Sequence, residues 1–360
     1  MSSLYRKYRP KTFAQVVGQE VIKKTLQQEL ATGMISHAYL FCGPRAVGKT
    51  TTARLFVRAL NCQQRKKGEY EPCNACDACV ALLANKTLDV MEVDAASHTG
   101  VDNVRETIIA ASRVGNTFLA HKAFIIDEVH MLSTSAFNAL LKTLEEPPAG
   151  VIFILATTEI HKVPLTIISR CQRFDFKLIG AADMKERLKG IILQEKREVS
   201  EEVLDHIVRL SQGCQRDSES LLGQLLAVKE KKIDSTIAQG ILAFSHHVFV
   251  DLLVSAVISK DQQKAFEIIA QGREQGVDSA LFIQDCVAVF RNVLHVKIGV
   301  LQKEQYEGLG FDTLSQLAKS VEPDKLLAII DFFMEAHREK RWIYLEQLPL
   351  EIAVVKSCSI

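Results

Sequence analysis

The sequence predicts an α/β fold, with a parallel sheet covered by helices on both faces, followed by regions made only of helices. A short apolar run, residues 37–42, leads into a glycine-rich loop and then into residues 51–60, whose apolar side chains have helical spacing. A second apolar run, residues 151–156, is continuous rather than alternating, as expected of a strand buried on both faces of a parallel sheet. Strand signals stop near residue 179, and helical patterns continue to the end.

The glycine-rich loop has the phosphate-binding pattern G-x-x-x-x-G-K-T at residues 43–50. In such a P-loop, backbone N–H groups surround the α- and β-phosphates, and the N-terminus of the next helix adds a positive dipole. Lys49 is expected to reach the β- and γ-phosphates, and the Thr50 hydroxyl to hold Mg²⁺. A chance match is the alternative, but the strand–loop–helix context favours a nucleotide site. The predicted nucleotide contacts in this stretch are Gly43, Pro44, Arg45, Ala46, Val47, Gly48, Lys49, Thr50 and Thr51.

Composition narrows the class of protein. With 360 residues and 48% hydrophobic content, the chain is long enough for about two or three domains with packed cores. The net charge of +1 gives no overall field that would attract nucleic acid, so any DNA contact must come from local patches. No secretory signal is evident, and no apolar run approaches the roughly 18–20 residues of a membrane span. We therefore expect a cytoplasmic protein whose nine cysteines are thiols or metal ligands rather than disulfides.

The residues before the P-loop contain one predicted helix and one ambiguous segment. Residues 4–13 combine basic and aromatic side chains, which on their own fit a nucleic-acid-binding arm and a solvated terminus equally well. Residues 21–30 have the spacing of an amphipathic helix that leads to the first strand.

A group of four cysteines follows the helix after the P-loop: Cys62, Cys73, Cys76 and Cys79. The last three form C-x-x-C-x-x-C, and a polar stretch, residues 63–72, separates them from the first. Four thiolates at this spacing, next to the turn-forming residues Pro72 and Asn74, fit a closed tetrahedral Zn²⁺ site. Free thiols and an iron–sulfur cluster are the alternatives. The other cysteines are scattered and are expected to be small buried residues.

A second nucleotide motif follows the strand predicted at residues 123–126, which runs directly into Asp127 and Glu128. An apolar strand that ends in two acids is typical of a P-loop ATPase, where Asp127 would hold Mg²⁺ and Glu128 would polarise the attacking water. In isolation the pair could be a surface turn, but the P-loop upstream favours the catalytic interpretation. A further strand is predicted at residues 90–93 and a helix at residues 102–111.

The predicted sheet is completed by the buried strand at residues 151–156 and a short strand at residues 174–176. A helix at residues 133–144 precedes the first of these and is stopped by two prolines. The strand at residues 151–156 ends in two threonines, where a hydroxyl could sense the γ-phosphate or simply cap a turn. Beyond the sheet, apolar residues recur three and four apart, which indicates packed helices. These helices are predicted at residues 184–195, 201–211, 216–228, 235–242, 246–259, 262–271, 279–299, 323–340 and 344–357.

With these motifs identified, the chain resembles the gamma/tau subunits of bacterial DNA polymerase III, which are AAA+ ATPases of the sliding-clamp loader. The likeness covers residues 1–175 almost continuously. It is looser over residues 179–243, and in the rest of the chain it is mainly one of helical character. It rests on Tyr8-Arg9-Pro10, Val17-Gly18-Gln19, the P-loop, the four cysteines, Asp94-Ala95-Ala96-Ser97, residues 126–132, residues 137–148, Ala156-Thr157-Thr158, Ser169-Arg170-Cys171, Gly213 and Arg216-Asp217.

The resemblance implies an α/β P-loop NTPase core of the AAA+ type, with a parallel αβα sheet and an inserted zinc knuckle, followed by an all-α lid and an all-α C-terminal collar. The core is expected at residues 1–178, with the zinc module at residues 61–82. The lid is expected at residues 179–243 and the oligomerisation collar at residues 244–360. The implied cofactors are ATP, Mg²⁺ and Zn²⁺.

The resemblance also implies roles for single residues. Thr158, in preference to Thr157, resembles the sensor of the γ-phosphate. Arg170 resembles an arginine finger that acts on ATP held by a neighbouring subunit, and Arg216 resembles a second sensor that links lid closure to bound ATP. The segment of residues 8–19 would pack around the adenine, which decides between the alternatives left open above. The catalytic set is therefore predicted as Lys49, Asp127, Glu128 and Arg170.

The implied function is that of an ATP-driven clamp-loader subunit, which hydrolyses ATP at subunit interfaces to open the sliding clamp and load it on primed DNA during replication. Polymerisation would belong to other subunits. The expected partners are other loader subunits in a hetero-oligomer, taken as a pentamer, together with the sliding clamp and primer-template DNA; single-strand binding protein is a further candidate. The alternatives are another AAA+ motor, such as a branch-migration helicase, and a structural loader subunit that does not hydrolyse ATP.

Three departures from the family pattern qualify these expectations. Ala46 stands where relatives commonly have glycine, and its methyl group would be strained if the backbone there is left-handed. The stretch Ser218-Glu219-Ser220 is polar where an apolar helix start is usual. The sequence stops at Ile360 without the long extension of a tau form, so a gamma-like chain is expected.

Overall fold

The computed structural model describes residues 3–97, 100–101, 104–228, 230–239, 241, 245–274, 277–301, 311–339 and 347–360. The chain forms two compact units, the first made of Met1–Glu198 with Ile207–Ala227 and the second of Val199–His206 with Val228–Ile360. The first unit holds the sheet and the predicted nucleotide motifs, and the second is mainly helical. The finer division into core, lid and collar stays a prediction.

The first unit is built on the predicted parallel sheet, whose strands lie in the order β2-β3-β4-β1-β5. Because β4 lies between β3 and β1, the carboxyl ends of these three strands are adjacent. The register pairs Cys42 at the end of β1 with Thr157 at the end of β4. The strands are β1 (Ala38–Cys42), β2 (Val90–Asp94), β3 (Lys122–Asp127), β4 (Val151–Thr157) and β5 (Gln172–Asp175).

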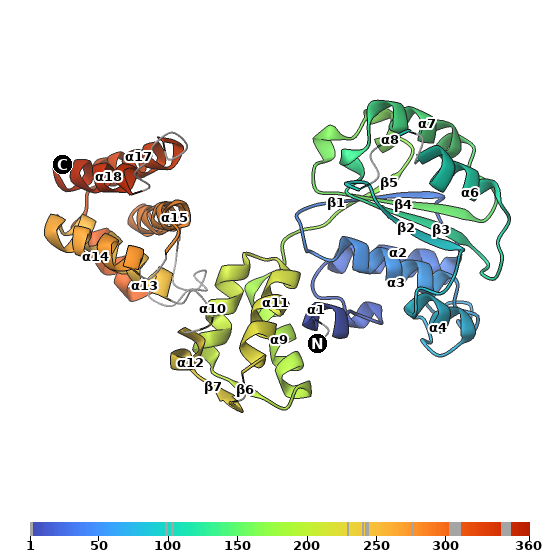
Figure 1. Ribbon diagram of the computed structural model, residues 1–360, viewed down its shortest axis with the longest axis horizontal. Coiled ribbons are helices and arrows are strands. Elements are labelled where there is room, and N and C mark those ends of the chain that lie inside the picture. The colour runs from blue at the N-terminus through green and yellow to red at the C-terminus, as the bar shows by residue number, and fades with distance from the viewer. Residues whose placement is uncertain are drawn as a thin grey trace. The chain divides into compact units, whose positions relative to one another are not determined.

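Helices cover both faces of this sheet (Figure 1). Alternate strand side chains enter two different cores: Tyr39 and Phe41 pack toward α2 and α3, whereas Leu40 packs toward α7 and α8. Since the inner strands β1, β3 and β4 are buried on each face, they need mostly apolar residues, which explains the continuous run in β4. The covering helices are α2 (Glu20–Thr32) and α3 (Lys49–Leu60) on one face, and α6 (Ala110–Arg113), α7 (Thr134–Glu145) and α8 (Leu165–Ile168) on the other.

Several short elements of the first unit were not predicted, because three to seven residues are too few to show a helical period. The helix predicted at residues 102–111 is a π-helix, η2 (Val104–Ile109), followed by α6; residues 102–103 lie outside the described part. The other short elements that were not predicted are α1 (Leu4–Lys7), η1 (Phe13–Gln15), α4 (Asp77–Leu83), η3 (Val129–Met131) and η4 (Ile160–Lys162). The helices predicted at residues 184–195 and 216–228 are α9 (Ala181–Gln194) and α11 (Gln215–Leu226).

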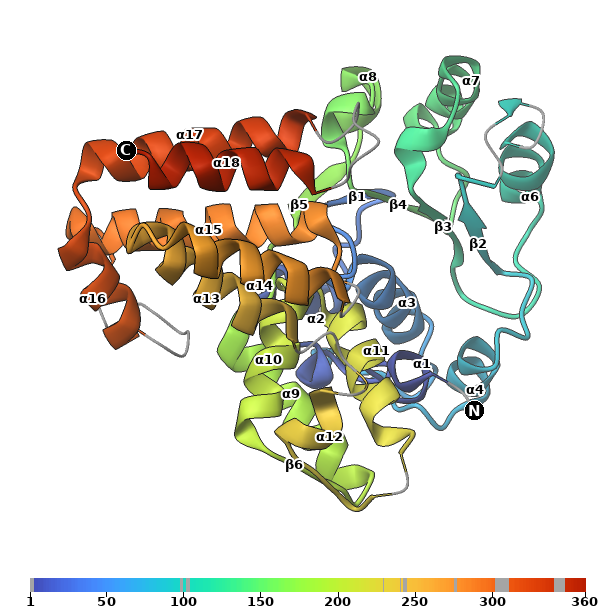
Figure 2. The same ribbon diagram turned by 60° about the vertical axis from the view of Figure 1, so that its left-hand side comes forward.

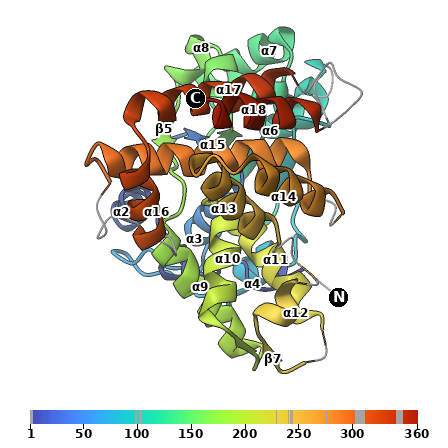
Figure 3. The same cartoon turned by 90° about the vertical axis from the view of Figure 1, so that its left-hand side faces the viewer.

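In the second unit, α15 lies between the α17–α18 pair and the α13–α14 pair (Figures 2 and 3). Phe290 of α15 and Phe333 of α17 meet at this centre with ring centroids 5.0 Å apart. The helices are α12 (Ser235–Gln239), α13 (Ser245–Ile258), α14 (Gln262–Glu274), α15 (Ser279–Lys297), α16 (Phe311–Ser320), α17 (Pro323–Glu339) and α18 (Leu348–Cys358).

The helical part of the chain differs from the prediction in three respects. The two-residue strands β6 (Glu198–Val199) and β7 (Lys232–Ile233) form a small sheet in a region predicted as all helix. In the chain, α10 (Glu201–Ser211) and α11 lie between them. Helix α16 was missed, although Leu314, Leu317 and Ala318 have helical spacing. Helix α15 is long and apolar enough to cross a membrane by length and composition, contrary to the sequence expectation. Its apolar side chains fill the core of the second unit, which accounts for that composition.

A buried carboxylate anchors the loop that leads into β3. Asp89, fully buried just before β2, accepts hydrogen bonds from the N–H groups of Thr117, Phe118 and Leu119 at 2.7–2.8 Å and from the Thr117 hydroxyl at 3.0 Å. Burial raises the pKa of this carboxyl, but the N–H groups outweigh burial and the net shift lowers the pKa. Asp89 thereby fixes the approach of β3 to β2.

Replacing Asp89 by Asn should lower the free energy of unfolding by about 2 kcal/mol at neutral pH, because hydrogen bonds to a charged acceptor are lost. Since the folded state lowers the pKa of this carboxyl, its stabilisation is present above the unfolded-state pKa and is lost as the pH falls through the folded-state value. Chemical denaturation over a pH series should therefore show the wild type and Asp89→Asn converging in acid. The exposed Asp77→Asn serves as control, and a pH-independent difference for Asp89→Asn would contradict the account.

Candidate nucleotide-binding site and metal centre

The predicted nucleotide motifs meet where β1, β4 and β3 end. The P-loop follows β1, and Asp127 is the last residue of β3. The Thr50 hydroxyl donates a hydrogen bond to Asp127 Oδ2 at 2.6 Å, so the two predicted magnesium ligands lie side by side. A hydroxyl and a carboxylate are hard oxygen donors of the kind that Mg²⁺ prefers. The donor set therefore fits magnesium.

The P-loop backbone depends on its glycines. Gly43 has φ 141°, and a Cβ at this position would lie 2.3 Å from the Phe176 carbonyl oxygen, so only glycine allows this approach to the chain after β5. Gly48 has φ 103° and directly precedes α3. The first N–H groups of a helix have no intrahelical acceptor, and those of α3 are available to phosphate oxygens.

Lys49 is buried and folds back on the P-loop, where its Nζ donates to the Gly43 and Pro44 carbonyl oxygens at 2.8 and 2.7 Å. Burial lowers the pKa of Lys49, whereas the carboxylates of Glu128 and Asp127 oppose this shift. The present hydrogen-bond partners of the Lys49 ammonium are neutral carbonyl oxygens. An anionic phosphate would accept stronger hydrogen bonds from it, so the position of Lys49 suits phosphate binding.

Ala46, which stands where relatives commonly have glycine, has a left-handed backbone with φ 62°. For an L-residue with a side chain this conformation costs about 1–2 kcal/mol. The loop therefore keeps the conformation for which a glycine would be better suited, and Ala46 carries local strain.

Glu128 also has a left-handed backbone, with φ 48°, and its N–H donates to Asp127 Oδ1 at 3.0 Å. The Thr158 hydroxyl donates to Glu128 Oε2 at 3.0 Å. Thr157 is fully buried instead, with its hydroxyl 3.0 Å from Nδ1 of His130. Of the two threonines at the end of β4, Thr158 is thus the one whose hydroxyl reaches the candidate catalytic acid.

The two candidate arginines lie in different places. Arg216 lines a cavity that extends from the P-loop, described below, with its guanidinium 5.7 Å from the centre of the Tyr5 ring. Arg170 is absent from the lining of that cavity. Its guanidinium contacts the Glu145 carboxylate and donates to the Thr166 carbonyl oxygen at 2.7 Å, with about a third of the side chain exposed. Arg170 is thus held away from its own P-loop.

A cavity of about 210 Å³ extends from the P-loop between the N-terminal segment, α9 and α11. Arg9, Pro10, Val16 and Val17, which belong to the segment predicted to pack around the adenine, line it. Sequence reasoning missed the other polar lining residues, although Glu219 was noted as an unusual polar residue. These are Tyr5, Arg54, Glu92, Arg187, Gln215 and Glu219.

Arg187 and Glu219 form a mostly buried ion pair in this cavity, with Nε and Oε1 3.2 Å apart. Burial raises the pKa of the Glu219 carboxyl, and the Arg187 cation opposes this shift. Arg187 also donates to the Tyr8 carbonyl oxygen and so connects α9 to the N-terminal segment.

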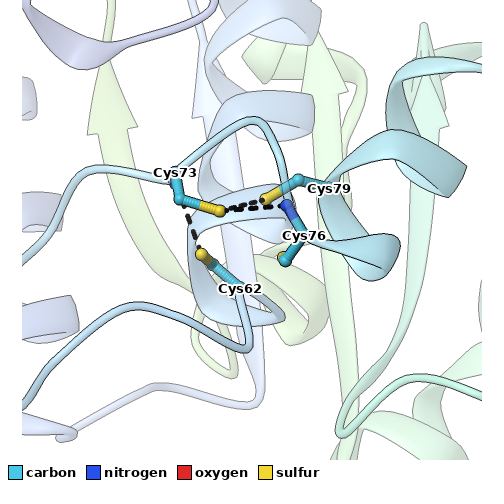
Figure 4. Close-up of side chains that lie close together, drawn as sticks. All are labelled: Cys62, Cys73, Cys76 and Cys79. Atoms are coloured by element: carbon cyan, nitrogen blue, oxygen red, sulfur yellow. Dashed lines mark hydrogen bonds between the residues drawn. The ribbon is translucent and has the colours of Figure 1, made fainter.

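The four predicted zinc ligands come together between α3 and α4 (Figure 4). Their Sγ atoms all lie within 4.8 Å of one another, and those of Cys73 and Cys79 are 4.0 Å apart. A zinc tetrahedron with Zn–S bonds of about 2.3 Å has S···S edges of about 3.8 Å, so the set fits zinc. Burial raises the pKa of the Cys76 thiol, but hydrogen bonds from the Cys79 and Gln63 backbone outweigh it and lower the pKa to about 6. In Cys76 this favours the thiolate that binds metal, whereas burial and the contact with Cys76 raise the pKa of the Cys79 thiol.

Comparison with known proteins agrees with the sequence motifs. A family model of the DNA polymerase III delta subunit matches residues 18–179, and one of DNA polymerase III subunits gamma and tau, domain III, matches residues 234–360. The chain is 41% identical to DNA polymerase III subunit tau of Bacillus subtilis, over 99% of this chain and 63% of that protein. The chain belongs to the gamma/tau family of DNA polymerase III subunits. This gamma/tau chain is also 32% identical to DNA polymerase III subunit tau of Salmonella typhimurium, over 98% of this chain and 55% of that protein.

The gamma/tau chain therefore spans between about half and two thirds of the length of these relatives. Its fold is similar to that of the RuvB Holliday junction branch migration motor of Thermotoga maritima, with a TM-score of 0.50 and 17% identity, over 70% of this chain and 79% of that one. At this identity the likeness concerns the fold alone, which is the predicted AAA+ α/β architecture. Family membership rests on the sequence relatives.

Replacing Ala46 by Gly should raise the free energy of unfolding by up to about 1 kcal/mol, because the left-handed strain removed exceeds the added flexibility of the unfolded chain. The control is Gly33→Ala, at a position with φ 77° and open space around it, which should destabilise the protein by a similar amount. Chemical denaturation of both variants tests this, and a destabilised Ala46→Gly would show that the methyl group makes contacts that outweigh the strain.

Metal analysis of the purified protein should find a single zinc ion per chain, bound by the four thiolates. Cys76→Ser should lose the metal and lower the melting temperature, whereas Cys358→Ser, in α18, should keep both. A brown protein with iron and sulfide, or full stability after complete removal of zinc by a chelator, would contradict a structural zinc site.

Proposed function

We propose that this chain is an ATP-driven motor subunit of a DNA polymerase III clamp loader, which binds and hydrolyses ATP to open the sliding clamp and load it on primed DNA. The observation that carries the proposal is the convergence of Lys49, Thr50, Asp127 and Glu128 at one edge of the sheet, in a chain of the gamma/tau family. These are the groups that a P-loop ATPase needs for phosphate, metal and water.

In this proposal each step is carried out by a particular residue. Lys49 and the N-terminus of α3 bind the phosphates and orient the γ-phosphate toward Glu128. Mg²⁺, held by Thr50 and Asp127, would neutralise charge that develops between the β- and γ-phosphates. Glu128 accepts the proton of the attacking water and must release the Thr158 hydroxyl, which is then free to contact the γ-phosphate. Arg216 contacts the phosphates from the lid.

Arg170 completes the site of a neighbouring subunit. It lies outside its own nucleotide cavity and is partly exposed, which suits a cation presented to another molecule. Such an arginine stabilises charge on the transferring phosphoryl group. Hydrolysis would therefore require assembly with other loader subunits, and the proposed setting is a cytoplasmic complex that also contacts the sliding clamp and primer-template DNA.

The two alternatives predict different behaviour. A branch-migration motor shares the fold, as RuvB shows, but the sequence relatives are gamma/tau subunits. A structural loader subunit would not need the complete catalytic set that this chain retains. The strained Ala46 and the polar stretch Ser218-Glu219-Ser220 leave the catalytic set of Lys49, Asp127 and Glu128 complete.

ATP turnover by the chain mixed with its loader partners should rise strongly when sliding clamp and primer-template DNA are both added. Lys49→Ala should abolish turnover by removing the phosphate contact. Arg170→Ala should lower it by about 10³-fold or more while ATP still binds. Arg173→Ala, which changes an exposed arginine paired with Asp175, is the matched control and should turn over normally. Turnover indifferent to clamp and DNA would favour another motor, and tight ATP binding without turnover would favour a structural subunit.

A further inference from the structure

The loop that carries the zinc ligands contacts a segment that lines the nucleotide cavity, although none of the four cysteines is in the lining of that cavity. This stretch of the N-terminal region, residues 9–17, is here called the wall segment. Arg9 and Pro10 line the cavity at one end of it, and Val16 and Val17 line the cavity at the other. Whatever holds the residues between them therefore also holds this wall.

Glu71, two residues before the zinc ligand Cys73, holds the middle of the wall segment. Its carboxylate accepts hydrogen bonds from the Phe13 N–H at 2.9 Å and from the Ala14 N–H at 3.1 Å, one on each oxygen. Phe13 and Ala14 begin the short helix η1, so these N–H groups have no acceptor within that helix. One carboxylate from the zinc loop thus fixes two successive residues of the wall segment.

A second contact holds the wall segment at the carbonyl group of Lys11. Asn74, which follows Cys73 directly, donates from Nδ2 to the Lys11 carbonyl oxygen at 3.0 Å. Arg58, which is buried on α3, donates to the same oxygen at 3.0 Å. The zinc loop, α3 and the wall segment are therefore joined at this carbonyl oxygen.

The order of the zinc loop depends on its cysteines. The loop has no helix or strand between the end of α3 and the start of α4, and residues 66–70 are all exposed. Arg65 holds only its first part, by donating to the Leu30 and Ala59 carbonyl oxygens at 2.7 and 2.8 Å. The small apolar cluster of this region is made largely of the zinc ligands themselves; its buried members are Cys62, Cys76, Ala78, Cys79 and Leu119. A bound metal therefore replaces the core that this loop lacks.

We propose that Glu71 and Asn74 couple the zinc centre to the nucleotide cavity: with the loop held at its cysteines, they position the wall segment against the base of the nucleotide. Glu71 is thus a positioning residue that touches neither ligand. The inference rests on the proposed function of the cavity as an ATP site. A wall that is ordered before the nucleotide arrives loses little conformational freedom on binding, so an ordered zinc loop strengthens ATP binding. Because coupling between two sites is reciprocal, bound ATP must also strengthen zinc binding.

Equilibrium binding of ATP and of inorganic tripolyphosphate to the isolated full chain tests the proposal. The P-loop holds the phosphates and the wall segment contacts the base. Glu71→Ala should therefore bind ATP about tenfold more weakly, because fewer molecules have an ordered wall, while its affinity for tripolyphosphate stays that of the wild type. Glu71→Gln, which keeps one acceptor oxygen, should lose less. Both variants should retain zinc, since the four thiolates are intact.

The matched control is Glu69→Ala, the same change two residues earlier in the loop, where the carboxylate accepts a hydrogen bond from the Lys66 N–H. It should bind both ligands like the wild type. An unchanged ATP affinity in Glu71→Ala, or equal losses for ATP and tripolyphosphate in both Glu71 variants, would overturn the inference while leaving the ATP site of the wild type intact. A wild type that binds neither ligand would overturn the proposed function together with the inference.

Zinc retention gives a second readout that does not depend on nucleotide affinity. At equilibrium with a competing chelator, the wild type should keep its zinc to a several-fold higher chelator concentration when ATP is present. In Glu71→Ala, ATP should give little protection, and this variant also controls for zinc bound by free ATP in solution. Zinc retention in the wild type that is indifferent to ATP, or equally protected in Glu71→Ala, would contradict the coupling.

Discussion

The hydrogen bond between the Thr50 hydroxyl and the Asp127 carboxylate is the contact on which the nucleotide site depends. It joins the first turn of α3, which follows β1 and the P-loop, to the end of β3. The strands β1 and β3 are separated in the sheet by β4. Both oxygens are held in place because these strands are buried on each face, so their carboxyl ends cannot shift without disrupting two cores. Sheet order and packing, rather than local loop structure, therefore set the geometry in which metal and phosphate are bound.

Two of the residues with a strained backbone lie next to this contact. Ala46 and Glu128 both have left-handed backbones, and Gly43 approaches the chain after β5 more closely than any side chain would allow. Such conformations persist only where the surrounding structure imposes them, and they are common at active sites. The same surroundings bury Lys49 and keep it bonded to carbonyl oxygens before phosphate arrives. The site is thus prepared for its ligand at some expense of local stability.

The sequence was sufficient where function lies in short contiguous motifs, and insufficient where it depends on distant contacts. The P-loop, the acids at the end of β3 and the four cysteines each carry their chemistry in a local pattern, and the structure brings together the residues within each of these sites. The Arg187–Glu219 ion pair was not foreseen, because only packing of α9 against α11 brings Arg187 to Glu219. Arg170 is a different case, since its proposed substrate contact belongs to another molecule. Elements such as β6 and α1 were missed because they are too short to show a period.

The most direct measurement of the central claim is the dependence of ATP affinity on Mg²⁺, compared between the wild type and Asp127→Asn. If Thr50 and Asp127 hold the metal against the phosphates, Mg²⁺ should tighten ATP binding by the wild type, and Asp127→Asn should lose most of that gain while its metal-free affinity stays close to that of the wild type. ATP binding that is indifferent to Mg²⁺ in the wild type, or a full metal effect in Asp127→Asn, would contradict the account.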